Sequence, residues 1–249
     1  MSPSRIRLSL LGLVPFAALV CAQPACAQSL HLDLGGGGTF TGQVIKLVLL
    51  VTVLSLAPSI LVMVTSFVRI VIVLSLLRTA IGLQQSPPNP VLVSLALFLT
   101  LFVMMPTFET AWREGIAPLI EEEIEEEVAL ERAARPFHEF MRRQVREKDV
   151  ALFLDIAGLQ PPEKAEDLPW RVLVPAFMIS ELRRAFEIGF IVFVPFLIID
   201  MVIACLLMAM GMMMLPPVMI SLPFKLIFFV LVDGWYLLVG SLVESFVRA

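Results

Sequence analysis

Long apolar runs separated by polar breaks dominate the chain. Residues 44–77 form an apolar run of 34 residues that contains Pro58 and few polar side chains. A straight helix of that length measures about 50 Å, and a bilayer core is about 30 Å thick. The run therefore predicts either a helix that kinks at Pro58 and extends beyond the membrane, or a helix that breaks at Pro58 into two pieces. The proline-rich stretch 84–90 predicts a polar turn, and 91–105 predicts a second apolar helix of only about 22 Å that stops before the next proline. Together these elements predict a first hydrophobic helical hairpin over 44–106.

A second pair of apolar helices is expected at the C-terminal end. A helix is predicted to begin at Pro169 and to run into the apolar stretch 188–215. Its apolar stripe at helical spacing consists of Trp170, Val174, Phe177, Met178 and Ala185. Glycine and two prolines within 211–217 predict a turn, and 218–243 predicts one last helix. Residues 185–249 are thus expected to form a second hydrophobic hairpin.

The segment between the two hairpins is strongly charged. Residues 107–184 hold 17 of the 22 acidic and 11 of the 18 basic residues, a net charge of −6. This composition predicts an extramembrane helical domain. Its first part, 109–150, is expected to be one long helix that carries the acidic run 121–127. Successive carboxylates on a helix point in different directions, so a solvated acidic face is favoured over a Ca²⁺ site.

The N-terminus has the pattern of a secretory signal peptide. Residues 1–27 combine two early arginines with an apolar stretch, 8–22, that is short for a transmembrane helix. The residues that define the expected cleavage site are Ala25, Ala27 and Gln28. An uncleaved first transmembrane helix is the alternative. Residues 28–43, which include four consecutive glycines, predict a flexible polar lead-in.

Composition agrees with a membrane protein. The chain of 249 residues is 59% hydrophobic and only 16% charged, with a mean hydropathy of +0.92. Its net charge of −4 argues against nucleic-acid binding. Cys21 and Cys26 lie in the segment expected to be removed, which leaves Cys205 without an intramolecular disulfide partner. The predicted fold class is an all-α membrane protein with about four hydrophobic helices.

Signal cleavage fixes a topology for these helices. The mature N-terminus then lies outside the cytoplasm, the turns at 78–90 and 211–217 lie inside, and the 107–184 domain is periplasmic. Arg69 and Arg78, beside the first inner turn, agree with the positive-inside rule.

The sequence carries no signature of an enzyme. His-Glu-x-x-His, Cys-x-x-Cys, Walker and Gly-x-Ser-x-Gly motifs are absent. His31 and His138 are the only histidines, and both fall in polar segments where a solvated surface position is expected. We therefore predict no catalytic residues, no metal and no cofactor.

Charged side chains inside the apolar helices are more informative. A lone charge in hydrocarbon costs about 2.5–3.5 kcal/mol on insertion scales, so such groups normally pair inside an assembly. In a helical hairpin, Asp200 and Lys225 lie within about one turn of each other, and Glu181 interrupts an apolar face. We predict that Glu181, Asp200 and Lys225 form a buried polar cluster within or between subunits. Snorkelling of these side chains to the membrane interface is the alternative.

Methionines crowd the second hairpin turn. They are Met208, Met210, Met212, Met213, Met214 and Met219. A methionine cluster is ordinarily core packing, because the side chain is flexible and fills irregular gaps. Met212, Met213 and Met214, however, lie between a glycine and two prolines, where a loop that points at a shared axis forms a deformable seal. Hydrophobic constrictions of this kind gate pores.

Several of these strings resemble one protein family. They are 78–89 (RTAIGLQQSPPN), 96–104 (ALFLTLFVM), 175–182 (PAFMISEL), 185–190 (AFEIGF), 195–201 (PFLIIDM), 210–217 (MGMMMLPP) and 221–225 (SLPFK). The chain resembles the FliP/SctR family of type III secretion export-gate subunits over about 44–243. The signal peptide is more similar to the flagellar branch of that family, FliP, than to its injectisome relatives. Residues 116–150 depart from the family pattern.

This resemblance implies a non-enzymatic subunit of a bacterial protein-export channel. About five copies are expected to assemble with the FliR and FliQ subunits, near FlhB and FlhA, around a channel for unfolded flagellar proteins. The site would be the inner membrane, within the flagellar basal body. The resemblance assigns Met212, Met213 and Met214 to a gasket around the closed pore, and Glu181, Asp200 and Lys225 to subunit contacts.

Two other functions remain open from the sequence. A small proton-coupled secondary transporter would use Asp200 and Asp233 as a proton relay. An assembly chaperone would have no pore of its own.

Overall fold

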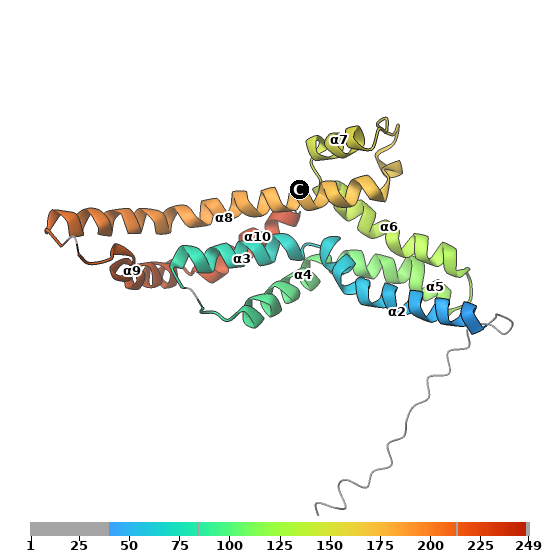
Figure 1. Ribbon diagram of the computed structural model, residues 1–249, viewed down its shortest axis with the longest axis horizontal. Coiled ribbons are helices and arrows are strands. Elements are labelled where there is room, and N and C mark those ends of the chain that lie inside the picture. The colour runs from blue at the N-terminus through green and yellow to red at the C-terminus, as the bar shows by residue number, and fades with distance from the viewer. Residues whose placement is uncertain (1–39, 84, 213, 248–249) are drawn as a thin grey trace, which may run out of the picture. The chain divides into compact units, whose positions relative to one another are not determined.

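The computed structural model describes residues 40–83, 85–212 and 214–247, and these residues form helices and turns with no strand (Figure 1). The predicted signal peptide, its cleavage residues Ala25, Ala27 and Gln28, and His31 lie outside the described residues. The chain divides into two units, residues 1–53 and 54–249. The described part of the first unit is the N-terminal portion of helix α2, and the second unit holds the packed core.

Helices joined by short connections make up the described residues. From the N-terminal to the C-terminal end they are α2 (Phe40–Met63), α3 (Phe67–Ile81), α4 (Asn89–Ala111), a π-helical turn η1 (Trp112–Ile116), α5 (Ala117–Ile120), α6 (Glu126–Gln144), α7 (Glu147–Ile156), a 3₁₀ turn η2 (Ala165–Asp167), α8 (Trp170–Ala209), α9 (Pro217–Leu231) and α10 (Gly234–Val247).

Prolines do not end the apolar helices as expected. Helix α2 passes through Pro58 and stops only at Met63, and α4 passes through Pro106. The prediction of a 15-residue second helix is therefore wrong, because α4 has 23 residues and measures about 35 Å, enough for a bilayer core. The break between α2 and α3 falls instead at residues 64–66, which are buried, so tertiary packing sets its position.

The acidic run is not part of a long helix. Residues 121–125 form the turn between α5 and α6, and Glu122 adopts a left-handed backbone conformation with φ of 57°. A Cβ atom on Gly115 would lie 2.7 Å from the Ala133 backbone nitrogen, so η1 and α6 pack backbone to backbone. This contact requires the chain to reverse direction between them, and a single helix over 109–150 cannot do so.

Helix α8 begins where the sequence predicts and runs unbroken for 40 residues, about 60 Å. It crosses the predicted domain boundary at residue 184 without interruption. After the methionine-rich turn the expected single helix over 218–243 is wrong, because α9 and α10 meet at an angle of 64°. Asp233 takes φ of 51° at this bend, and a Cβ on Gly234 would lie 2.2 Å from the Phe229 ring. Glycine at 234 therefore lets the chain close onto that ring.

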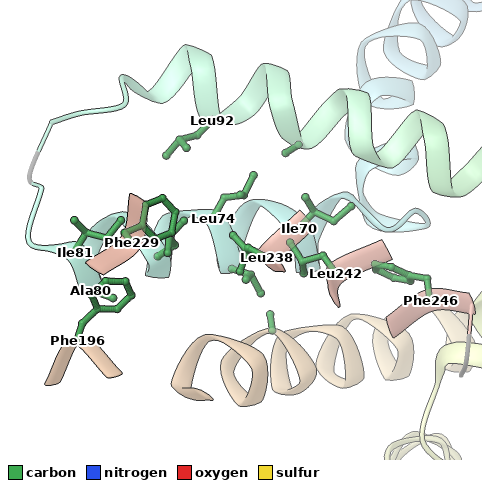
Figure 2. Close-up of a cluster of buried hydrophobic side chains, with 14 residues drawn as sticks. Ile70, Leu74, Ala80, Ile81, Leu92, Phe196, Phe229, Leu238, Leu242 and Phe246 are labelled. Carbon is green, nitrogen blue, oxygen red and sulfur yellow. The ribbon is translucent and has the colours of Figure 1, made fainter. Parts of the chain in front are cut away.

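Helix α3 occupies the centre of the main apolar core. Figure 2 shows side chains of α3, α4, α8, α9 and α10 that converge there. The labelled members are Ile70, Leu74, Ala80, Ile81, Leu92, Phe196, Phe229, Leu238, Leu242 and Phe246. A second core lies between α6, α7 and the start of α8, around Met141, Leu173 and Phe177. Apolar residues from 70–96 and from 185–246, which are far apart in the sequence, thus share one buried cluster.

Two helical stretches in the described part are long and apolar enough to cross a membrane, Asn89–Ile120 and Trp170–Ala209. Two bent pairs pass the same test only when each is taken as one span: α2 from Leu47 with α3, and α9 with α10. The described residues therefore hold two to four candidate spans. Large apolar side chains remain exposed along them, including Phe98 and Phe102 on α4 and Phe190 on α8.

Candidate functional site

A buried arginine joins four helices. Arg69 of α3 donates from Nε to Glu181 Oε2 of α8 at 2.8 Å, and its Nη2 group bonds the other oxygen of the same carboxylate. Nη2 also donates to Gln144 Oε1 of α6 at 2.9 Å, and Nη1 donates to Ser245 Oγ of α10 at 3.0 Å. The guanidinium carbon lies 3.7 Å from the centre of the Phe246 ring. Arg69 and Glu181 are both fully buried.

Gln144 completes this arrangement, which we call the Arg69 clasp (Arg69, Gln144, Glu181 and Ser245). Its amide oxygen also accepts from Arg184 Nη1 at 2.7 Å, and its amide nitrogen donates to the Phe246 carbonyl at 3.1 Å. A buried ion pair is tolerated when its geometry is good and further hydrogen bonds satisfy the remaining donors and lone pairs. The clasp meets that condition and fixes the register of α3, α6, α8 and α10.

The three charges expected in one cluster are held in two places. Glu181 pairs with Arg69, whereas Asp200 and Lys225 bind each other. Arg69, which the sequence places beside the first inner turn, lies in α3 with no exposed side-chain surface. The sequence did contain a signal for the buried position of Arg69. A lone arginine in an apolar run carries the same free-energy cost of insertion into hydrocarbon that identified Glu181, Asp200 and Lys225 as paired charges.

The second pair braces the α8–α9 hairpin. Lys225 Nζ of α9 donates to Asp200 Oδ2 of α8 at 2.6 Å and to the Ala80 carbonyl at the end of α3 at 3.1 Å. Ser221 Oγ donates to Asp200 Oδ1 at 2.5 Å. Lys225 and Ser221 are buried, and the Asp200 side chain is about one-third exposed, at 32%. The predicted register of the hairpin agrees with this contact, while Ser221 and Ala80 were not foreseen.

A third polar contact ties α7, which lies outside the candidate spans, to Ser180 of α8. Asp149 accepts from Ser180 Oγ at 2.5 Å and from Arg146 Nε and Nη2 at 2.9 Å each. Burial raises the pKa of Asp149, but the hydrogen bonds from Ser180 and Arg146 outweigh it, so the net pKa lies below its ordinary value. The carboxylate therefore stays ionised in this buried position.

His138 is not the solvated surface residue that the sequence predicts. It is buried, its Nε2 lies 2.8 Å from the Leu168 carbonyl, and its ring packs edge to face on Trp170. It thus anchors the 157–169 connection to α6. Among the residues that the structure describes, no group of three or more His, Cys, Asp or Glu side chains is placed to hold a metal ion.

The methionine-rich turn lies at the end of the α8–α9 hairpin. Met212 is half-buried, Met214 is 99% exposed, and Met213 lies outside the described residues. Met208, Met210 and Met219 beside the turn are also exposed. Flexible apolar side chains therefore gather at one exposed end of the long hairpin.

The helical fold, the membrane-length apolar stretches and the internal ion pairs define a class: an all-helical protein, in the part described, that fits a membrane location. The chain belongs to the FliP family, which it matches over residues 50–242. The family resemblance inferred from the motif strings is thereby confirmed.

Individual relatives share much of the chain. It is 61% identical over 236 residues to the flagellar biosynthetic protein FliP of Caulobacter vibrioides. The aligned residues make up 93% of this chain and 89% of that protein. The protein of the same name from Bacillus subtilis is 57% identical over 202 residues, 81% of this chain and 91% of the relative. That of Rhizobium meliloti is 52% identical over 242 residues, 93% of this chain and 99% of the relative.

Proposed function

We propose that this chain acts in flagellar biosynthesis as a core, pore-forming subunit of a type III protein export gate. Its role is non-enzymatic: copies of the chain surround a channel through which unfolded flagellar proteins pass. Family membership and the flagellar names of its relatives support this proposal.

The observation that carries the pore proposal is the exposed methionine turn. Met214 is almost completely exposed at the end of a hairpin that the Asp200–Lys225 pair holds together. Apolar side chains gathered at one end of a molecule indicate a surface that a partner covers. With several copies around one axis, Met212, Met213 and Met214 meet and close the channel as a soft gasket.

The proposal also covers the partner subunits, the membrane location and the topology of the chain. About five copies assemble with FliR and FliQ, near FlhB and FlhA, in the inner membrane at the flagellar basal body. The signal peptide is cleaved before Gln28, and the 107–184 domain is periplasmic. Exposed apolar side chains along α4 and α8, such as Phe102 and Phe190, supply surface for these neighbours and for lipid.

The test replaces Met212, Met213 and Met214 with alanine in cells that also express the partner gate subunits. We expect leakage of small ions across the inner membrane, with complex assembly unchanged on a native gel. The control is Met63→Ala, which removes an exposed methionine at the end of α2, outside the turn, and should leave the membrane tight. A tight membrane with an assembled triple variant would return the methionines to ordinary packing.

Asp200→Asn separates the gate from a proton-coupled transporter. In the gate, the neutral amide weakens the bond from Lys225 that holds α8 to α9, so less assembled complex is expected on the native gel. A transporter that uses Asp200 as a proton relay would assemble normally and lose transport. Normal assembly together with lost export would therefore contradict the gate.

A further inference from the structure

A small cavity of about 250 Å³ opens beside the end of α3, between α4, residues 85–87 and the α9–α10 bend. Its lining is apolar except for Arg78 and Ser86, and includes Leu77, Phe229, Val230 and Trp235. None of the residues of the Arg69 clasp, the Asp200–Lys225 pair or the methionine turn lines it. Nothing in the proposed gate uses it.

The walls of the cavity are apolar and its mouth is open. Leu74, Leu77 and Ile81 at its inner wall are buried, whereas Val230 is 74% exposed and Trp235 is 39% exposed. An apolar wall offers water few hydrogen bonds. A flexible hydrocarbon chain is the better occupant.

Arg78 is the only charged side chain among the lining residues. Its Nη1 group donates to Asn89 Oδ1 at 2.5 Å and to the Pro87 carbonyl at 3.3 Å. Within the described part of the chain, its Nε and Nη2 groups make no hydrogen bond, and Arg78 forms no ion pair. The guanidinium is therefore anchored by one nitrogen and keeps donors for an anion, and planar pairs of N–H groups suit phosphate oxygens.

We propose that this cavity binds a glycerophospholipid: one acyl chain enters between Leu77, Phe229 and Val230, and the phosphodiester bonds Arg78. An arginine and a tryptophan at the mouth of an apolar cavity are the groups that anchor helices at the membrane interface. Basic pockets between membrane helices bind lipid phosphates by the same chemistry. The proposal requires only a membrane location and does not depend on the export function.

The test measures lipid binding to the purified protein by native mass spectrometry in detergent. Phosphatidylglycerol and phosphatidylethanolamine both carry the phosphodiester and are expected to bind, and diacylglycerol, which lacks it, is expected to bind about tenfold more weakly or worse. Arg78→Gln should weaken phosphatidylglycerol binding by a similar factor. Arg113→Gln, at an exposed arginine outside the cavity, should not.

A second pair of variants tests the acyl-chain site with Arg78 intact. Val230→Trp fills the mouth of the cavity and should abolish retention of phosphatidylglycerol. Leu231→Trp adds the same bulk at the neighbouring exposed position, which does not line the cavity, and should leave binding unchanged. Thermal unfolding of each variant establishes that it is folded.

Each of the other outcomes overturns the proposal. Binding that depends on Arg78 but not on Val230 is surface attraction of a headgroup, and binding that depends on Val230 but not on Arg78 involves no phosphate contact. If Val230→Trp instead blocks assembly with partner subunits in lipid-free detergent, the cavity receives a protein side chain.

Discussion

The Arg69 clasp yields the sharpest prediction about stability. Arg69→Met keeps an unbranched apolar stem but removes every hydrogen bond of the guanidinium, including both bonds to Glu181. The Glu181 carboxylate is then left fully buried without the cation that bonds both of its oxygens. Gln144 and Ser245 lose their bonds from Arg69 in the same step.

The expected loss is large for a single substitution. Removing one partner from a buried ion pair costs about 3–5 kcal/mol, because the remaining charge is uncompensated. For a chain of this size each kcal/mol lowers the unfolding midpoint by roughly 2–4 °C, so a decrease of about 6–20 °C is expected. Arg113→Met, where the arginine side chain is 76% exposed, should change stability by less than about 0.5 kcal/mol.

The assay is thermal unfolding of the purified protein in mild detergent, followed by circular dichroism, as a double-mutant cycle. Glu181→Leu alone should also destabilise, because it leaves Arg69 buried without its carboxylate. The double variant Arg69→Met/Glu181→Leu removes both charges and should recover at least half of the loss, a coupling of about 2 kcal/mol or more. Additive single losses, or an Arg69→Met variant as stable as wild type, would refute the clasp as the link between these helices.

Two further predictions concern α7 and α6. Burial raises the pKa of Asp149, but its hydrogen bonds to Ser180 and Arg146 lower it by more, so its folded pKa lies below the unfolded value of about 3.9. Its contribution to stability is then complete above that value and is lost as the pH falls through the folded pKa. Asp149→Asn should flatten the dependence of the unfolding midpoint on pH below about pH 4, and parallel curves for variant and wild type would contradict this. Gly115→Ala forces a Cβ against α6 backbone atoms and should cost about 1–3 kcal/mol, whereas Gly240→Ala meets nothing within 4 Å and should stabilise by about 0.5–1 kcal/mol. Equal midpoints for the two alanine variants would remove the argument for close packing.

The sequence by itself was enough to predict the apolar helices and to recognise the protein family. Apolar runs of bilayer length predict helices whatever their neighbours are, because backbone hydrogen bonds within a helix are local. The start of α8 after Pro169 and the turn near Gly211 followed from such local signals. The facing positions of Asp200 and Lys225 followed from counting residues on either side of that turn.

Tertiary structure decided where the helices break and which charges meet. Pro58 and Pro106 are accommodated inside helices, while one break falls at the buried residues 64–66, where packing sets the backbone. The other break falls at Asp233-Gly234, a dipeptide that favours turns, where the backbone also closes onto the Phe229 ring. Arg69 and Glu181 are 112 residues apart, and no periodicity links positions at that distance. Their pairing exists because α3 and α8 pack against each other, and a buried charge must find its partner among whatever side chains that packing brings near.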